Sequence, residues 1–232
     1  MDRSYTYLLI NLLSVAMPLA FSFEPRVRFA GWWKYLFPAM LITAAPFLAW
    51  DAFFTIEGVW GFNPDYLTGW HLGVLPVEEI LFFLAIPYAS IFIYAAWNWW
   101  KPESPLMDRM AKPITWFFIL LALAGLVFFY DRWYTAVNCA FALVLLLVQQ
   151  FLVKGSYMGR FWRFYLVHLI PFFLVNGILT GSWIKAPVVW YNNAENTGIR
   201  IGTVPIEDSM YSLSLMLMNI MLIERWKKPA VI

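Results

Sequence analysis

The stretch IGTVPIEDSMY (residues 201–211) places two neighbouring carboxylates, Glu207 and Asp208, directly before an apolar run. An earlier stretch, HLGVLPVEEILFF (residues 71–83), has the same shape: a glycine, a proline, one aliphatic residue and then a pair of glutamates. Each apolar run that follows is of the length expected for a membrane helix. Ionisable groups at membrane depth are costly and usually functional, so the paired acids bear on both the fold and the chemistry.

The two stretches belong to a longer internal repeat with one constant offset, that between Glu78 and Glu207. When the sequence is shifted by this offset, residues in three other places also coincide. The matched segments are Asp2–Thr6 with Asp131–Thr135, Trp33-Lys34 with Trp162-Arg163, Phe62-Asn63 with Tyr191-Asn192, and Gly69–Glu79 with Gly198–Asp208. One offset serves all of them without a gap, which favours a tandem duplication of a three-helix unit.

The composition predicts an integral membrane protein. The chain is 62% hydrophobic and 13% charged, whereas soluble domains are typically about 25% charged. Spanning helices need about 17–25 apolar residues, and seven segments meet this requirement. The predicted spans are Tyr5–Phe23, Trp33–Phe54, Glu78–Trp97, Pro113–Tyr130, Trp133–Val153, Phe161–Gly181 and Glu207–Ile223.

These spans predict an all-α membrane fold of seven helices, with two three-helix repeats (residues 1–100 and 131–232) joined by a linker that holds one helix (residues 101–130). A three-helix unit ends on the opposite side from its start, and the linker helix returns the chain, so the repeats are expected to be parallel. Twelve of the sixteen Lys and Arg residues, Lys228 among them, fall on one side of this topology. The positive-inside rule then places the N-terminus outside and the C-terminus in the cytoplasm, with the cell (inner) membrane as the expected location.

Paired acids at helix starts have two interpretations. Carboxylates cap free N–H groups and complement the helix dipole at that end, and Pro76 and Pro205 suit a helix start. Alternatively, a carboxyl group enclosed by apolar walls stays protonated and serves acid–base chemistry. Two copies with matched glycines and amides favour the second interpretation. Neighbouring helix residues point about 100° apart, so the two acids of each pair are not expected to share one role.

The remaining polar residues near the paired acids are candidates for binding or orienting groups. Asp51 lies near the end of the second span, where its counterpart in the other repeat is Thr180. His71 and Arg200 occupy equivalent positions, and each could orient a carboxylate. The other candidates are Asn63, Asn176, Asn192, Trp60 and Tyr191, together with the two prolines. The aromatic rings around the loops can line an interface or stabilise a carbocation.

Several kinds of site are missing from the sequence. It contains no glycine-rich nucleotide loop, no cluster of Cys and His for a metal or haem, and no Asp-rich repeat for magnesium diphosphate. We therefore expect no cofactor, no metal and no nucleic-acid partner. Proton-driven chemistry on a very apolar substrate in the lipid bilayer fits what remains.

The motif Pro-x-Glu-(Glu/Asp), at Pro76–Glu79 and Pro205–Asp208, resembles the signature of the membrane-integral lycopene cyclase domain. The chain resembles the fused form of this family, in which two three-helix units are joined by an extra helix, over nearly its whole length. The segments LTG (residues 67–69), WYNN (190–193) and GIRIGTVPIED (198–208) add specificity to the resemblance.

The resemblance implies conversion of lycopene, through γ-carotene, to β-carotene without net redox change. It also implies that Glu78 and Glu207 are the leading acids, with Glu79 and Asp208 as partners in cation stabilisation or deprotonation. Three other functions stay open at this point: a cyclase of C50 or other acyclic carotenoids, a proton-coupled transporter, and a membrane prenyltransferase. Helix-start acids near the interface disfavour transport, and the missing diphosphate-binding aspartates disfavour the prenyltransferase.

Overall fold

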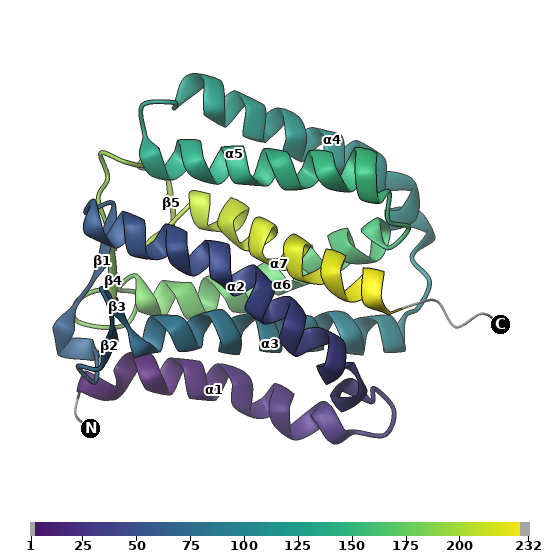
Figure 1. Ribbon diagram of the computed structural model, residues 1–232, viewed down its shortest axis with the longest axis horizontal. Coiled ribbons are helices and arrows are strands. Elements are labelled where there is room, and N and C mark those ends of the chain that lie inside the picture. The colour runs from purple at the N-terminus through teal and green to yellow at the C-terminus, as the bar shows by residue number, and fades with distance from the viewer. Residues whose placement is uncertain (1–2, 228–232) are drawn as a thin grey trace.

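Long helices lie side by side along the longest axis of the molecule (Figure 1). The structure, a computed structural model, describes residues 3–227, so the predictions at Asp2 and Lys228 fall outside the described residues. Within this range the α-helices are α1 (Thr6–Ala20), α2 (Trp33–Ile56), α3 (Val77–Trp100), α4 (Pro105–Phe128), α5 (Trp133–Leu147), α6 (Met158–Leu179) and α7 (Glu207–Trp226). A π-helical segment (Val148–Val153) extends α5, and short 3-10 segments occupy Arg3–Tyr5, Phe21–Phe23, Phe29–Trp32 and Pro64–Tyr66.

Six of these helical segments are long and apolar enough to cross a membrane, and they match predicted spans one to one. The largest difference is in α4, which begins at Pro105, because Pro113 lies inside the helix instead of starting it. The seventh predicted span, α7, forms a helix but is not among the six. Its hydropathy is lower because it faces protein: Ser212, Ser214 and Asn219 are buried.

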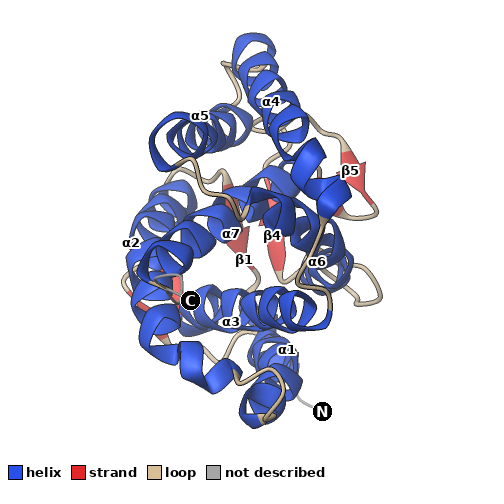
Figure 2. Cartoon of the chain, turned by 90° about the vertical axis from the view of Figure 1, so that its right-hand side faces the viewer, coloured by secondary structure: helices blue, strands red, loops and turns tan. Residues whose placement is uncertain are grey.

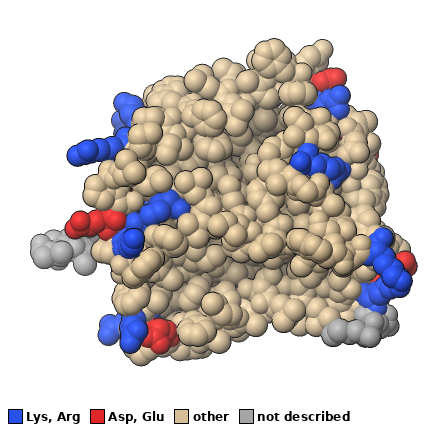
Figure 3. Space-filling view, turned by 180° about the vertical axis from the view of Figure 1, so that it is seen from behind, with Lys and Arg blue, Asp and Glu red and all other residues tan. Residues whose placement is uncertain are grey.

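The outer surface of the bundle suits lipid. On the face that Figure 3 shows, charged side chains gather toward the two ends of the helices. Between the ends, large apolar side chains in mid-helix are open to the surroundings, with Leu13 72%, Leu120 60% and Ile170 66% exposed. Exposing this much apolar surface to water is unfavourable, whereas exposing it to the hydrocarbon core of a bilayer is not. The chain is therefore an all-α membrane protein.

The interior is organised around α7, which lies among α2, α3, α5 and α6 when the bundle is seen from one end (Figure 2). Leu213, Met216 and Ile220 on α7 are fully buried and pack with Phe47 of α2 and Ala142 of α5. Because α7 contacts both the first and the second half of the chain, it holds the acids of its own first turn in the middle of the molecule.

Two short hairpins precede the acid-bearing helices and repeat the same geometry. The first pairs β2 (His71–Leu72) with β3 (Leu75–Pro76), and the second pairs β5 (Arg200–Ile201) with β6 (Val204–Pro205). The turn glycines, Gly73 and Gly202, both have φ of +65°, a conformation that residues with a Cβ rarely adopt. The offset predicted from the sequence therefore describes these hairpins correctly.

A third strand pair joins the two halves of the chain. β1 (Trp60–Phe62) runs antiparallel to β4 (Val189–Tyr191), with Trp60 opposite Tyr191 and Phe62 opposite Val189. Figure 2 shows β1 and β4 side by side behind the helices. We use "hairpin end" for the end of the bundle that carries β1 to β6; the carboxyl end of α7 lies at the opposite end (Figure 1).

The prediction of one gapless offset is wrong for the first helix of each half. Tyr7 and Asn11 of α1 contact Glu79 and the backbone of Glu78. The residues that make the same contacts from α5 are Tyr134 and Asn138, toward Asp208 and Glu207. The offset between these partners (134 − 7) is smaller by two than the offset between the acids (207 − 78). The second half is thus longer by two positions between its first helix and its acids, a difference that the matched Asp-Arg pairs at residues 2–3 and 131–132 conceal.

Candidate active site

A small buried cavity of about 50 Å³ lies at the hairpin end between the two halves of the chain. Three carboxyl groups line it, those of Asp51, Glu79 and Asp208, and their residues are 2%, 8% and 2% exposed. None of the described residues that line the cavity is a lysine or an arginine. Aromatic residues form most of the remaining wall: Tyr7, Trp60, Phe62, Phe82, Tyr134, Phe172, Tyr191 and Tyr211.

Asp208, in the first turn of α7, is surrounded by hydrogen-bond donors. The hydroxyl of Tyr134 on α5 donates to Oδ1. Oδ2 accepts from the Tyr191 hydroxyl at 3.1 Å and from the Asn176 amide at 3.2 Å. Burial, and then the neighbouring Asp208 carboxylate, raise the pKa of the Tyr191 hydroxyl, so this group stays a donor. Three donors to one carboxylate favour its ionised form.

Glu79, in the first turn of α3, has a different environment. One donor, the Tyr7 hydroxyl, reaches its Oε2 at 2.5 Å. Its other close polar neighbour is a second acid, Asp51 of α2, with which it interacts electrostatically. Asp51 accepts a hydrogen bond from Trp60 Nε1 at 2.6 Å through Oδ1. Two neighbouring carboxyl groups at a buried site cannot both be ionised without a large cost, so one of the two is expected to hold a proton.

The difference between the two carboxylate environments comes from substitutions at equivalent positions of the repeat. At the offset that relates the acids, Tyr191 corresponds to Phe62, and Asn176 corresponds to Phe47. The half that carries Glu79 thus has phenyl rings where the other half has donors, whereas Asp51 corresponds to Thr180. One half holds an acid pair and the other holds a single carboxylate with several donors.

Glu78 and Glu207 do not line this cavity. Oε1 of Glu78 accepts from the backbone N–H and the hydroxyl of Thr68, at 2.7 and 2.6 Å. Oε1 of Glu207 accepts from the backbone N–H of Thr197 at 2.6 Å and from the Thr135 hydroxyl at 2.8 Å. Each of these acids thus ties the loop before its hairpin to the start of the following helix, which is close to the capping role considered for the paired acids.

Several other predicted site residues also lie outside the cavity. Asn63 and Asn192 each accept a hydrogen bond from the backbone N–H two positions later, at 3.0 Å, and so shape turns. His71 is exposed and contacts the carbonyl of Gly69, and Arg200 donates to the Thr203 carbonyl and to Asn193. Neither forms a hydrogen bond or ion pair with a carboxylate of the described residues. Pro76 and Pro205 form strand pairs with these two residues.

A second, apolar cavity of about 90 Å³ adjoins the first. It lies between α1, α3 and α6, and Phe172 and Asn176 of α6 line both cavities. From Asn176 it follows α6 toward mid-membrane as far as His168, about 12 Å along the helix at the usual rise of 1.5 Å per residue. His168 donates or accepts one hydrogen bond, with Ser212 at 2.6 Å.

Sequence reasoning identified Tyr191 but missed the other tyrosines of the cavity. Tyr7 and Tyr134 donate to Glu79 and Asp208, and Tyr211 lies beside Trp60 with a ring separation of 6.3 Å. A signal for the first two was present in the sequence: Tyr7-x-x-x-Asn11 repeats as Tyr134-x-x-x-Asn138, but at the smaller of the two offsets.

Within the described residues, no group of three or more His, Cys, Asp or Glu side chains is arranged to hold a metal ion.

Comparison with known proteins agrees with this geometry. The sequence profile of the family described as Lycopene cyclase matches the chain twice, at residues 4–97 and 131–226. The chain therefore belongs to the lycopene cyclase family. The starts of the two matches (131 − 4) are closer by two positions than their ends (226 − 97), which is the same difference seen between α1 and α5.

A curated relative is the "Bifunctional lycopene cyclase/phytoene synthase" of Aspergillus oryzae, with 25% identity over 83 residues. The match covers 36% of this chain and 14% of that protein, so most of the relative lies outside the match. No solved structure matches the chain. Family membership supports cyclase activity.

Proposed function

We propose that the protein is a lycopene β-cyclase, an isomerase that converts lycopene through γ-carotene to β-carotene. The observation that carries this proposal is the buried cavity in which an acid pair, Glu79 with Asp51, lies near a separate carboxylate, Asp208, among aromatic rings. Cyclisation of a polyene end needs a proton donor, a wall that tolerates a cation and a proton acceptor.

In this mechanism Glu79 is the general acid. The proton shared with Asp51 adds to the terminal double bond of the substrate and leaves a tertiary cation. Asp51 accepts a hydrogen bond from Trp60 and thereby stabilises the negative charge left on the pair. General acid catalysis by a positioned carboxyl group contributes about 10²–10⁴-fold in rate.

Ring closure and deprotonation follow in the same cavity. The neighbouring double bond attacks the cation, which forms the ring bond and moves the positive charge onto the ring. The faces of Trp60, Tyr134 and Tyr211 can stabilise this charge, by about 2 kcal/mol where water is excluded. Asp208 then removes a ring proton, and the position of that proton decides the ring type. One proton enters and one leaves, so no redox partner is needed.

The part of the polyene next to the reacting end would enter the apolar cavity beside α6. Its walls connect with the carboxyl cavity through Phe172 and Asn176, and it runs from the hairpin end toward mid-membrane. Because both acid motifs serve one cavity, a substrate about as long as the hydrocarbon core, about 30 Å, presents one end at a time.

The placement in the membrane is part of the same proposal. We infer that α7 also spans the bilayer, that the two three-helix repeats are parallel, and that residues 101–130 return the chain between them. The excess of Lys and Arg at the end of the bundle opposite the hairpins supports a cytoplasmic location for that end, with the protein in the cell membrane. The cavity would then lie toward the outer face, with the C-terminus inside.

Expression in a host that accumulates lycopene, followed by chromatography of the pigments, tests the function. We expect β-carotene with the wild-type chain and unchanged lycopene with Asp208→Asn. Glu103→Gln is a matched control, since Glu103 is exposed at the opposite end. Unchanged lycopene with wild-type protein present in the membrane would overturn the assignment. Cyclic products from a longer acyclic carotenoid alone would move it to that substrate.

A further inference from the structure

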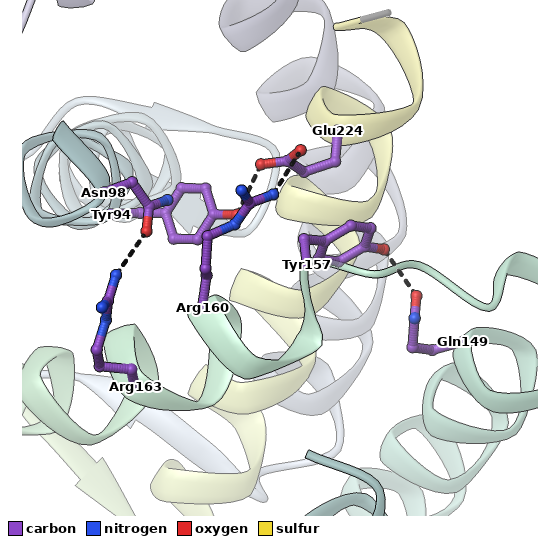
Figure 4. Close-up of polar contacts among 7 residues, drawn as sticks. All are labelled: Tyr94, Asn98, Gln149, Tyr157, Arg160, Arg163 and Glu224. Atoms are coloured by element: carbon purple, nitrogen blue, oxygen red, sulfur yellow. Dashed lines mark hydrogen bonds and ion pairs between the residues drawn. The ribbon is translucent and has the colours of Figure 1, made fainter. Parts of the chain in front are cut away.

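A large open cavity of about 630 Å³ lies at the end of the bundle opposite the hairpins. Its walls come from the carboxyl ends of α3 and α7, the amino end of α6 and Trp32 before α2. Nothing in the proposed cyclisation uses it, because the carboxyl cavity is at the other end of the helices. Figure 4 shows some of its polar wall, with Asn98, Tyr157, Arg160 and Glu224, together with neighbouring side chains.

Positive charge dominates the cavity wall. Arg160, Arg225 and Lys227 line it against one acid, Glu224. That acid is already engaged: its Oε1 accepts the Tyr94 hydroxyl at 2.6 Å and its Oε2 faces Arg160 at 3.6 Å (Figure 4). The Nε of Arg160 is buried and has no hydrogen-bond partner among the described residues. Donor capacity toward an anion therefore remains.

A neighbouring arginine and a tyrosine at this end of the bundle make structural contacts. Arg163, one turn after Arg160, donates to Asn98 at 3.0 Å (Figure 4) and to the carbonyl of Lys101 at 2.7 Å, although its Nε, like that of Arg160, has no hydrogen-bond partner among the described residues. The Tyr157 hydroxyl donates to Gln149 at 2.7 Å. Arg163 thus ties α6 to the end of α3 and does not line the cavity, whereas Arg160 lines it.

Lys227 lines the cavity, and its ammonium group contacts an aromatic ring but forms no ion pair with a carboxylate of the described residues. The ammonium lies 3.0 Å from the centre of the Trp32 ring. Burial lowers the pKa of Lys227 to about 8. A cation in such a place gains from an anion that enters beside it.

The amino end of α6 adds to the positive potential. Its N-cap residue, Tyr157, makes no side-chain capping hydrogen bond, and Ser156 and Tyr157 line the cavity. Free N–H groups and the helix dipole favour phosphate at such an end. Basic residues after α7 also complement the carboxyl end of that helix, but this role does not require a cavity shared with α6.

We propose that this cavity binds a phosphate group through Arg160, Lys227 and Arg225. The source that the location favours is the headgroup of an anionic phospholipid, because the cavity opens at the end of membrane helices, between apolar and aromatic surfaces. Basic pockets between helix ends on the cytoplasmic side hold such headgroups in other membrane proteins.

A binding measurement tests the proposal without relying on cyclase activity. Delipidated protein in neutral detergent is titrated with phosphatidylglycerol, phosphatidylcholine or inorganic phosphate, and bound ligand is counted by native mass spectrometry. We expect phosphatidylglycerol to bind, with affinity about tenfold weaker in Lys227→Gln and in Arg160→Gln, since a charge-assisted contact is lost. Arg109→Gln, an exposed basic residue at the same end and outside the cavity, should match wild type.

The outcomes distinguish three cases: a lipid headgroup in the cavity, a soluble phosphate ligand in the cavity, and no specific phosphate site. Binding of phosphatidylglycerol alone supports the lipid headgroup, and equal competition by inorganic phosphate supports a soluble phosphate ligand in the same site. Equal binding of phosphatidylcholine, or equal weakening by Arg109→Gln, would overturn the proposal in favour of general attraction. Lys227→Gln leaves the Arg160–Glu224 pair intact, so its result stands even if Arg160→Gln fails to fold.

Discussion

Neighbouring acids in this chain have different surroundings although their side chains have nearly the same chemistry. Glu78 is held by Thr68 in the loop, whereas the next residue, Glu79, lines the cavity with Tyr7. Glu207 and Asp208 divide in the same way. The rotation of about 100° between successive helix residues separates the two positions, and we propose that the capping interpretation of the motif applies to one acid of each pair and the catalytic interpretation to the other.

This division predicts different losses for the two kinds of acid. Glu79→Gln should lower the rate of ring formation at least about 100-fold, the lower range of general acid catalysis, while leaving the thermal midpoint nearly unchanged. Glu78→Gln should instead weaken the loop contact, lower the midpoint and retain most of the activity per folded molecule. Pigment analysis and thermal unfolding of each variant measure both quantities. The reverse pattern would return the acid role to Glu78 and Glu207, as the resemblance implied.

Lys227 predicts a pH effect at the opposite end. Because its pKa is lowered to about 8, its ammonium is present at pH 7 and lost as the pH rises toward 9. The charged groups facing it are Glu224 on α7 and Arg160 on α6. Phosphatidylglycerol should therefore bind more weakly at pH 9 than at pH 7 in wild type. Lys227→Arg, whose guanidinium does not titrate in this range, should abolish the difference; persistence of the difference would assign it to another group.

At the scale of elements, the strand pair β1–β4 fixes the distance between the two halves of the carboxyl cavity. Trp60 and Tyr191 are opposite one another in this pair and donate to Asp51 and Asp208 respectively. Gly61 is the middle residue of β1, and a Cβ at this position would meet the ring of Trp190. Close contact of the two strands thus depends on the absence of a side chain there.

Gly61→Ala is accordingly expected to push Trp190 aside and to destabilise the protein by about 1–3 kcal/mol, as overpacking usually does. The lost activity should exceed the lost stability, because both donors move with the strands. Gly31→Ala is the matched control, since a Cβ there meets nothing within 4 Å. Equal effects of the two substitutions on midpoint and product would show that the strand pair does not set the cavity.

The apolar cavity beside α6 gives a second prediction at this scale. Ala89→Phe should fill it and block the polyene, so that lycopene accumulates although the carboxyl groups are intact. Ala45→Phe, on the exposed side of α2, changes the same side chain outside the cavity and should leave turnover unchanged. Membrane content of the two variants, measured on blots, corrects for expression. Full activity of Ala89→Phe would place the polyene elsewhere.

The long elements were predictable from sequence, and so were some partners of the acids, Tyr191, Asn176 and Trp60, whereas the tyrosines of the first helix in each half were not. Hydrophobic length identified six spans, and matched motifs located both hairpins. The bounds failed where Pro113 continued α4 instead of starting it. The tyrosines were missed because Tyr7 and Tyr134 follow a different offset from the acids, and because contacts between residues far apart in the chain, such as Tyr7 and Glu79, depend on how helices pack.

At the scale of the whole molecule, two acid motifs converge on one cavity instead of forming two sites. A linear substrate with two reactive ends must therefore leave and return, or turn, between ring closures. During a time course with limiting enzyme, γ-carotene should rise before β-carotene and then fall, as chromatography of timed extracts would show. A second ring appearing without free γ-carotene, even when unlabelled γ-carotene is added to trap it, would contradict a single one-ended cavity.

The β1–β4 pair also has a consequence for the life of the chain before it is complete. Trp60 cannot pair until Tyr191 has been synthesised, when most of the second half already exists. Until then the first half carries an unpaired strand edge and an acid pair without its separate carboxylate. An interrupted or truncated product would thus lack the complete cavity and would be open to strand exchange with another copy.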